Sequence, residues 1–323
     1  MAEPAADGRR AEPYRLAGRR VWVAGHRGMV GAALCRRLER EGVELLTVGR
    51  ERVDLRRQVE VEAWMDAARP DLVFLAAATV GGILANATYP ADFLYDNLMV
   101  EANVVEAARR SAVGRLVLLG SSCISPRLAP QPIPEAALLS GPLEPTNQWY
   151  AVAKIAGIKL GQAYRRQHGL DVISAMPTNL YGPGDDFDLL SSHVVPALIR
   201  KIHEATVAGR DTVEIWGSGQ PRREFLHVDD CADAVVHLAQ HYDGEEQVNV
   251  GCGQDVTIRE LAEIIARVAG YRGRFVFDAT KPDGTPRKLL DVGRLTALGW
   301  RPAIDLERGL AQTYAWYRAQ RGG

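Results

Sequence analysis

The chain has 323 residues, of which 47% are hydrophobic and 24% charged, and its formal net charge at pH 7 is -1. This length and composition predict a packed globular protein with one large domain and a smaller one. The balanced charge and the absence of a long basic run argue against nucleic-acid and membrane-surface partners. No apolar run reaches the roughly 18 residues that a membrane span needs, and the N-terminus lacks a signal-peptide core, so we expect a cytoplasmic protein that binds small molecules.

The four cysteines stand at positions 35, 123, 231 and 252 and form no CxxC pair. A spacing this wide indicates neither a disulfide framework nor a zinc site, and we expect no bound metal. Any cysteine chemistry must therefore come from a single thiol. Cys123 stands out because it follows an apolar, strand-like run and two serines in LVLLGSSC.

Short apolar runs alternate with amphipathic stretches through the first half of the chain. The first cycle contains VWVAG (21–25), a helix-like stretch over 29–42 and VELLTVG (43–49). Such alternation is typical of βαβ units and predicts an α/β fold with a doubly wound parallel sheet of the Rossmann type over residues 18–178.

The remaining segments depart from this rhythm. Residues 1–17 are rich in Ala, Glu, Arg, Gly and Pro and have no apolar period, which predicts a disordered tail. Residues 179–222 and 251–323 predict a smaller α/β domain that binds the substrate. Between them, near 223–250, the chain is expected to return to the first domain.

A glycine-rich loop, GHRGMVG (25–31), joins the first predicted strand to the first predicted helix. Glycines there allow a tight turn and a close approach of the backbone to a pyrophosphate, and the helix N-terminus directs free N–H groups at it. In this position the pattern is a strong indication of a dinucleotide site. The expected cofactor contacts in the loop are Gly25, Arg27, Gly28, Met29, Val30 and Gly31.

The charges after the second predicted strand bear on which dinucleotide is bound. NAD sites commonly place an acidic residue there to hold the ribose 2′-OH. Here Arg50, with Arg27 and Arg52, forms a cationic set suited to the 2′-phosphate of NADP(H). NADP(H) is therefore the predicted cofactor, while Glu51 and Asp54 fall in the usual range for the acidic residue and keep NAD open.

Tyr150 and Lys154 lie four residues apart in YAVAK, so on a helix they share one face. A lysine ammonium beside a phenol favours the phenolate and lets the tyrosine act as an acid near neutral pH. Together with GHRGMVG, the AAA at 76–78 and Ser121, this pair makes the sequence resemble the extended short-chain dehydrogenase/reductase superfamily. The resemblance implies that Ser121 and Tyr150 hydrogen-bond a substrate carbonyl while NADPH delivers hydride.

A closer resemblance covers residues 18–317. The motifs that carry it are AGHRGMVG (24–31), YPADF (89–93), GSSCI (120–124), LEPTN (143–147), AKIAGIKL (153–160), MPTNLYGP (176–183), SHVVPAL (192–198), REFLHVDD (223–230) and KPDGTPRKLLDV (281–292). These motifs are similar to those of the GDP-L-fucose synthase family. The resemblance implies an NADPH-dependent homodimer that epimerises GDP-4-keto-6-deoxymannose at C3 and C5 and then reduces C4.

The chemistry of epimerisation and the family resemblance both indicate Cys123 and His193. A 4-keto group acidifies the protons on its neighbouring carbons, so epimerisation needs a base on one face of the ring and an acid on the other. A thiol and an imidazole can fill these roles near neutral pH. The resemblance implies that Cys123 is the base and His193 the acid, and that Ser121, Tyr150 and Lys154 complete the catalytic set.

Further site residues follow from the resemblance alone. It implies phosphate contacts for Arg223 and Lys288, and a charge-assisted bond to phosphate suits both side chains. The expected substrate contacts are Ser122, Asn179, His193, Lys201, Trp216, Arg223 and Lys288. Beyond the glycine loop, the expected cofactor contacts are Arg50, Ala76, Ala77, Ala78, Lys154, Pro177, Asn179 and Leu180.

Two departures from the family pattern lie beside the predicted chemistry. Ser125 stands where the family usually has tyrosine, and Gln148 and Trp149 stand where it usually has Glu-Pro. Exchanges of this size reshape a pocket by more than one methylene, which itself changes discrimination by about 1–3 kcal/mol. A second hypothesis therefore stays open: a dTDP-4-keto-6-deoxyhexose 4-ketoreductase with little or no epimerase activity. A nucleotide-sugar sensor without chemistry is disfavoured, because the serine, tyrosine and lysine are all present.

Overall fold

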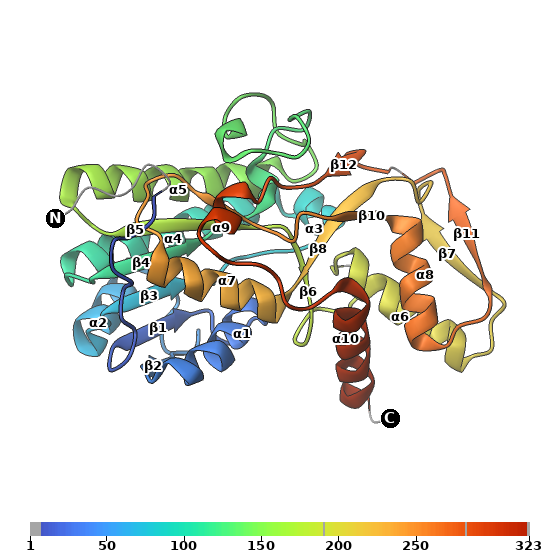
Figure 1. The fold of residues 1–323 in the computed structure, drawn as a ribbon, viewed down its shortest axis with the longest axis horizontal. Coiled ribbons are helices and arrows are strands. Elements are labelled where there is room, and N and C mark those ends of the chain that lie inside the picture. The colour runs from blue at the N-terminus through green and yellow to red at the C-terminus, as the bar shows by residue number, and fades with distance from the viewer. Residues whose placement is uncertain (1–7, 190, 282, 322–323) are drawn as a thin grey trace.

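A computed structural model describes residues 8–189, 191–281 and 283–321 and shows a large sheet beside a smaller one (Figure 1). The large sheet has six parallel strands in the order β2-β1-β3-β4-β5-β9. These strands are β1 (Arg20–Ala24), β2 (Glu44–Leu46), β3 (Leu72–Leu75), β4 (Arg115–Leu119), β5 (Val172–Pro177) and β9 (Val248–Val250). Most are continuous buried runs, as expected for a parallel sheet covered on both faces. The predicted α/β fold with a doubly wound parallel sheet is confirmed.

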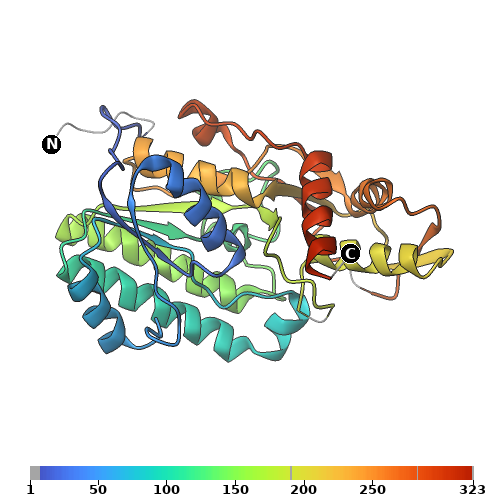
Figure 2. The ribbon, with the colours of Figure 1, turned by 90° about the horizontal axis from the view of Figure 1, so that it is seen from below.

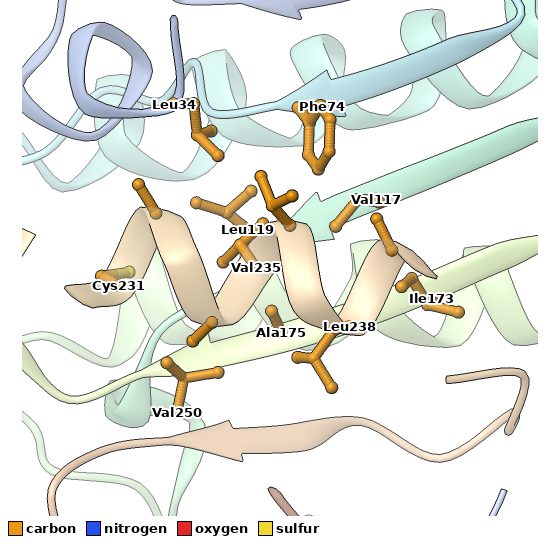
Figure 3. Close-up of a cluster of buried hydrophobic side chains, with 14 of the residues drawn as sticks. Leu34, Phe74, Val117, Leu119, Ile173, Ala175, Cys231, Val235, Leu238 and Val250 are labelled. Carbon is orange, nitrogen blue, oxygen red and sulfur yellow. The ribbon is translucent and has the colours of Figure 1, made fainter. Parts of the chain in front are cut away.

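Helices cover the two faces of this sheet (Figure 2). On one face lie α1 (Met29–Leu38) and α7 (Val228–His241), and on the other lie α2 (Gln58–Ala68), α4 (Pro90–Arg110) and α5 (Gln148–His168). Two short helices, η1 (Glu39–Glu41) and α3 (Ile83–Thr88), belong to connections. Figure 3 shows how the apolar side of α7 packs on the sheet, with Val235 and Leu238 among side chains from β4 and β5. Buried apolar side chains form one layer on each face of the sheet, one on the α7 side and one on the opposite side, and these layers fix the strands relative to one another.

The smaller part of the fold is built around β8 (Arg222–His227). This strand pairs in parallel with β6 (Asn179–Tyr181) and β12 (Arg287–Lys288) and antiparallel with β10 (Asp255–Thr257). A separate parallel pair consists of β7 (Thr212–Trp216) and β11 (Arg274–Asp278). The helices here are α6 (Val194–Val207), α8 (Ile258–Ala269), α9 (Gly293–Ala297) and α10 (Leu306–Gln320). The domain limits given from the sequence remain a prediction.

One buried carboxylate joins the two sheets. Glu224 of β8 is fully buried, and its side chain accepts hydrogen bonds from the backbone N–H groups of Gly253 at 2.7 Å and Leu290 at 3.1 Å. Its backbone carbonyl accepts from the side chains of Thr178 and Asn179, which directly follow β5. The end of the large sheet is therefore tied to the centre of the small one.

Residues 8–17 lie against the large domain, although their composition predicts disorder. Arg10 pairs with Asp171 and Asp243 at 3.3 and 3.6 Å, and the N–H of Tyr14 donates to the carbonyl of residue 240 at 2.7 Å. Leu16 is 2% exposed and belongs to the apolar layer on the α7 side. The predicted disorder therefore does not describe residues 8–17, because isolated anchors such as these form no sequence period. Residues 1–7 of the predicted tail lie outside the described residues.

Within the described part of the chain, no helix combines the length and the apolarity needed to cross a membrane. Among the same residues, no group of three or more His, Cys, Asp or Glu side chains is arranged to hold a metal ion.

Replacement of Leu16 tests whether the N-terminal segment is part of the cooperative fold. Leu16→Ala should lower the free energy of unfolding by about 2–5 kcal/mol, because it leaves a cavity in the core. Arg15→Ala is the matched control, since Arg15 is exposed, and a surface change of this kind should stay within about 0.5 kcal/mol. Urea denaturation measures both values. Equal stability of the two variants would contradict this assignment.

Candidate active site

Several of the predicted site residues lie at the carboxyl edge of the large sheet. Gly25 follows β1, Ala76 follows β3, Gly120 and Ser121 follow β4, and Thr178 follows β5. Because these strands are parallel, the loops that follow them share one edge, which is where doubly wound sheets bind ligands. The small sheet begins at the same edge, since β6 starts two residues after β5 ends.

The glycine loop has the geometry that its sequence predicts. Gly25 has φ +90°, and a Cβ there would lie 2.6 Å from the backbone nitrogen of Ala77. A Cβ on Gly31 would lie 2.1 Å from the carbonyl oxygen of Gly25. Only glycine fits both positions, so the loop can close tightly before α1 begins at Met29. No side chain caps α1, and its N-terminus can therefore attract an anionic group such as a pyrophosphate.

Two of the three cations expected near the adenosine ribose, Arg27 and Arg50, are paired with Glu51 and Asp54, the carboxylates that left NAD as an alternative cofactor. Arg27 donates to both oxygens of Glu51, at 2.8 and 2.6 Å, and Arg50 lies 3.9 Å from Asp54. Arg27 and Glu51 are both largely exposed. A 2′-phosphate would have to compete with Glu51 for the Arg27 guanidinium.

Several other expected cofactor contacts are packed into the protein. Met29, Val30, Ala76 and Leu180 pack against the apolar layer on the α7 side. Ala77 packs against the opposite layer, Ala78 is half-buried, and Pro177 is buried at the end of β5. Their backbone positions line the edge of the sheet, whereas contact with a cofactor remains a prediction.

Ser121 and Tyr150 meet beside the end of β4. The Ser121 hydroxyl accepts a hydrogen bond from the N–H of Cys123 at 3.2 Å, and Cys123 belongs to the short helix η2 (Ser122–Ile124). Burial raises the pKa of Tyr150 to about 12, while the Lys154 ammonium and a hydrogen bond with Ser121 lower it. The phenol is therefore a proton donor at neutral pH.

Lys154 is anchored behind Tyr150. Its Nζ donates to the Glu101 carboxylate at 2.8 Å and to the carbonyl of Leu119, the last residue of β4, at 3.0 Å. It also lies 5.8 Å from the centre of the Tyr150 ring. Burial by itself lowers the pKa of Lys154. Glu101 and Tyr150 raise it by a larger amount, so the pKa lies above its ordinary value.

The Cys123 sulfur lies between two nitrogen donors. Asn147 Nδ2 donates to Sγ at 3.2 Å, and Lys288 Nζ lies 3.8 Å from the same atom. Lys288 was expected to bind phosphate, whereas its ammonium lies beside the thiol. Asn147 was missed, although LEPTN was among the family motifs and ends three residues before Tyr150.

His193 belongs to the same edge. It is the N-cap residue of α6, without a capping hydrogen bond from its side chain, and the N–H of Gly82, in the loop after β3, donates to the carbonyl of Ser191 at 2.9 Å. Desolvation lowers the pKa of His193, and the Asp186 carboxylate opposes that change. The imidazolium is thus a minor species at pH 7 and a ready proton donor when it forms.

An aromatic and cationic group lies on the small domain. Trp216 at the end of β7 is 58% exposed, with the ammonium groups of Lys201 and Lys281 at 5.1 and 5.4 Å from its ring centre. Lys281 was not singled out from the sequence, although it opens the KPDGTPRK motif. Exposed tryptophan between two cations can hold a flat, anionic ligand.

The remaining expected substrate contacts are partly engaged within the protein. Arg223 pairs in register with Lys288 across β8 and β12, so two cations stand side by side. Burial lowers the pKa of Arg223, and the carboxylates of Glu144 and Asp283 oppose that change. The Asn179 amide donates to the Glu224 carbonyl at 2.8 Å, and Ser122 is buried.

The arrangement can therefore carry out proton transfers on a carbonyl compound. A hydroxyl and a phenol are placed to hold a carbonyl oxygen, an ammonium lies behind the phenol, and a thiol with two donors lies next to them. Such preplaced donors stabilise negative charge that develops on oxygen during reduction.

Residues 21–251 match the NAD dependent epimerase/dehydratase family, and this is the class of enzyme that the fold and the site define. GDP-L-fucose synthase of Sinorhizobium fredii is 59% identical over 301 residues, which are 93% of this chain and 96% of that protein. GDP-L-fucose synthase 1 of Arabidopsis thaliana is 57% identical over 92% of this chain and 93% of its own length. A solved structure of a GDP-L-fucose synthetase from Naegleria fowleri bound to NADP has a TM-score of 0.89 at 26% identity, covering 97% of this chain and 98% of that one. The chain belongs to the GDP-L-fucose synthase family.

Proposed function

We propose that this enzyme uses NADPH to convert GDP-4-keto-6-deoxymannose to GDP-L-fucose, first inverting C3 and C5 and then reducing the C4 carbonyl. The observation that carries the proposal is the thiol of Cys123, which touches Asn147 and Lys288 next to the Ser121 and Tyr150 hydroxyls. A plain ketoreductase needs only the hydroxyls and the lysine. A thiol with donors of its own supports a second reaction at the neighbouring carbons.

The cofactor that we propose is NADPH, a dinucleotide with a 2′-phosphate. The cradle around Gly25 and Gly31, where a side chain would collide with the backbone, leaves room for a pyrophosphate. Arg27 and Arg50 supply cations for the 2′-phosphate, and NADP is bound in the Naegleria fowleri structure. When bound, NADPH supplies the hydride for C4.

Ser121 and Tyr150 hold the C4 carbonyl oxygen, and Tyr150 gives it a proton as hydride arrives. The Lys154 ammonium lowers the free energy of the phenolate that remains, because the two groups share one face of α5. Proton transfer from a positioned acid contributes about 10²–10⁴-fold to rate.

In the epimerisation Cys123 removes the proton at C3 or C5, and His193 returns a proton to the opposite face. The C4 oxygen carries the negative charge of the enolate between the two transfers, and the same hydroxyls that serve the reduction stabilise it. Asn147 and Lys288 hold the sulfur in position.

The GDP part of the substrate is assigned to the small domain. Trp216 stacks on the guanine, and Lys201, Lys281 and Arg223 bind the diphosphate. We also infer a homodimer through α4 and α5, because Tyr95, Trp149 and Val152 on these helices expose large apolar surface.

Tyr150→Phe tests the reductase. It should lower NADPH oxidation with GDP-4-keto-6-deoxymannose by about 100-fold or more, because the phenol is the acid. Tyr164→Phe on the same helix is the control, since its hydroxyl contacts Glu106 at 3.0 Å and not the site. The rate is followed by NADPH absorbance. Full turnover by Tyr150→Phe would refute the reductase assignment.

Cys123→Ser tests the epimerase. In deuterium oxide the unchanged enzyme should incorporate deuterium at C3 and C5, as seen by NMR of the product, and Cys123→Ser should stop this exchange while reduction continues. Cys252→Ser, which alters a half-buried thiol that packs against the apolar layer on the α7 side, should behave like the unchanged enzyme. Reduction without any deuterium in the unchanged enzyme would favour the ketoreductase hypothesis, and a dTDP sugar as the preferred substrate would establish it.

Arg27→Gln tests the choice of cofactor. The KM for NADPH should rise about tenfold or more while the KM for NADH changes little, because a charge-assisted bond contributes about 1.5–3 kcal/mol. Arg36→Gln is the control, since Arg36 lies on α1 and pairs with Asp229. An unchanged ratio of the two KM values in Arg27→Gln would exclude Arg27 as the phosphate ligand.

A further inference from the structure

A buried ion pair connects α4 to α5 directly behind the reacting groups. Glu101 Oε1 lies 2.8 Å from Lys154 Nζ, and the two side chains are only 5% and 2% exposed. Lys154 uses a second hydrogen to bond the Leu119 carbonyl at 3.0 Å. The ammonium is thus fixed from two sides, which restricts the direction of its remaining hydrogen.

The glycine at position 157 makes room for this carboxylate. A Cβ on Gly157 would lie 2.0 Å from Glu101 Oε2. Glycine in the middle of a helix costs about 1 kcal/mol relative to alanine, and Gly157 lies well inside α5. Oε2 is itself buried and has no side-chain partner, and burial raises the pKa of Glu101 while Lys154 and the Gly157 backbone oppose that change. Neither the glycine inside the helix nor the buried carboxylate oxygen benefits helix stability or packing. Both indicate that the carboxylate is required next to Lys154.

We propose that Glu101 is a positioning residue that keeps Lys154 charged and directed at Tyr150 throughout the working pH range. The inference rests on the proposed function, because it concerns the acid of the reduction. Glu101 acts chiefly through Lys154, which it contacts directly and which is itself among the expected cofactor contacts.

The electrostatic balance around Lys154 supports this role. A fully buried lysine without a partner can have its pKa lowered by about 3–5 units, which would leave it neutral near pH 7. The titratable groups that act on Lys154 are Glu101 from α4 and Tyr150 from its own helix, and together they raise its pKa above the ordinary value. From η2, Cys123 acts on Tyr150 rather than on Lys154.

Glu101 also acts on Tyr150 directly, and in the opposite sense. Its negative charge raises the pKa of the phenol, whereas the Lys154 charge lowers it by a larger amount. Loss of Glu101 would remove the smaller, unfavourable effect. It would also leave Lys154 without the partner that keeps it protonated, and a neutral Lys154 no longer lowers the pKa of Tyr150. The net effect of Glu101 is therefore to keep Tyr150 acidic above neutral pH.

Glu101→Gln separates this role from a structural one. In a pH series of kcat for NADPH oxidation, the alkaline limb should move to lower pH by at least about one unit, because Lys154 loses its proton earlier. Glu106→Gln is the matched control: it lies on α4 and removes an ion pair with Arg109, and its alkaline limb should stay in place. A merely structural role would lower the amount of folded enzyme without moving the limb.

Two further variants keep the proposal testable if Glu101→Gln does not fold. Glu101→Asp retains the charge, so its alkaline limb should stay near that of the unchanged enzyme even if kcat falls. Gly157→Ala displaces the carboxylate, so its limb should move in the same direction as that of Glu101→Gln. A folded Glu101→Gln or Gly157→Ala whose limb does not move would overturn the proposal. Absence of NADPH oxidation by the unchanged enzyme would instead refute the proposed function.

Discussion

The buried carboxylate of Glu224 holds the two sheets together, and the contact between Cys123 and Lys288 depends on that junction. Its side chain binds the backbone at Gly253 and Leu290, and its carbonyl binds Thr178 and Asn179 after β5. A buried acceptor with this many donors is stable, because each lone pair that leaves water finds a partner. The thiol lies on the large domain and Lys288 on the small one, so their contact exists only while this junction is intact.

Burial and pairing together set the acidities at the site. Tyr150 and Lys154 are both withdrawn from water, which disfavours charge on either of them. Glu101 compensates the lysine, and the lysine in turn favours the phenolate. The low-dielectric surroundings make each of these short contacts stronger than it would be in water.

Some features of the site could be predicted from the sequence and others could not. The glycine loop was predictable because its strand, turn and helix are contiguous, and the φ of Gly25 and the crowding at Gly31 agree with that reading. The serine, tyrosine and lysine were found through spacing and resemblance. Glu101 and Asn147 were missed, because each is an ordinary polar residue whose meaning comes from a distant neighbour. Lys288 was expected to bind phosphate, and its contact with the thiol could not be predicted because Cys123 is also distant in sequence.

The sequence by itself determined the alternation of strands and helices, the dinucleotide loop and the residue types available for catalysis. These features depend on periodicity and on spacings of a few residues, which local backbone geometry converts directly into structure. Only the tertiary structure decided which groups act together: Glu101 meets Lys154 across 53 positions of sequence, and Lys288 meets Cys123 across 165. It also decided that residues 8–17 belong to the fold, through Leu16 and Arg10. Contacts of this kind arise from the packing of helices and the joining of two sheets, and no local pattern in the chain encodes them.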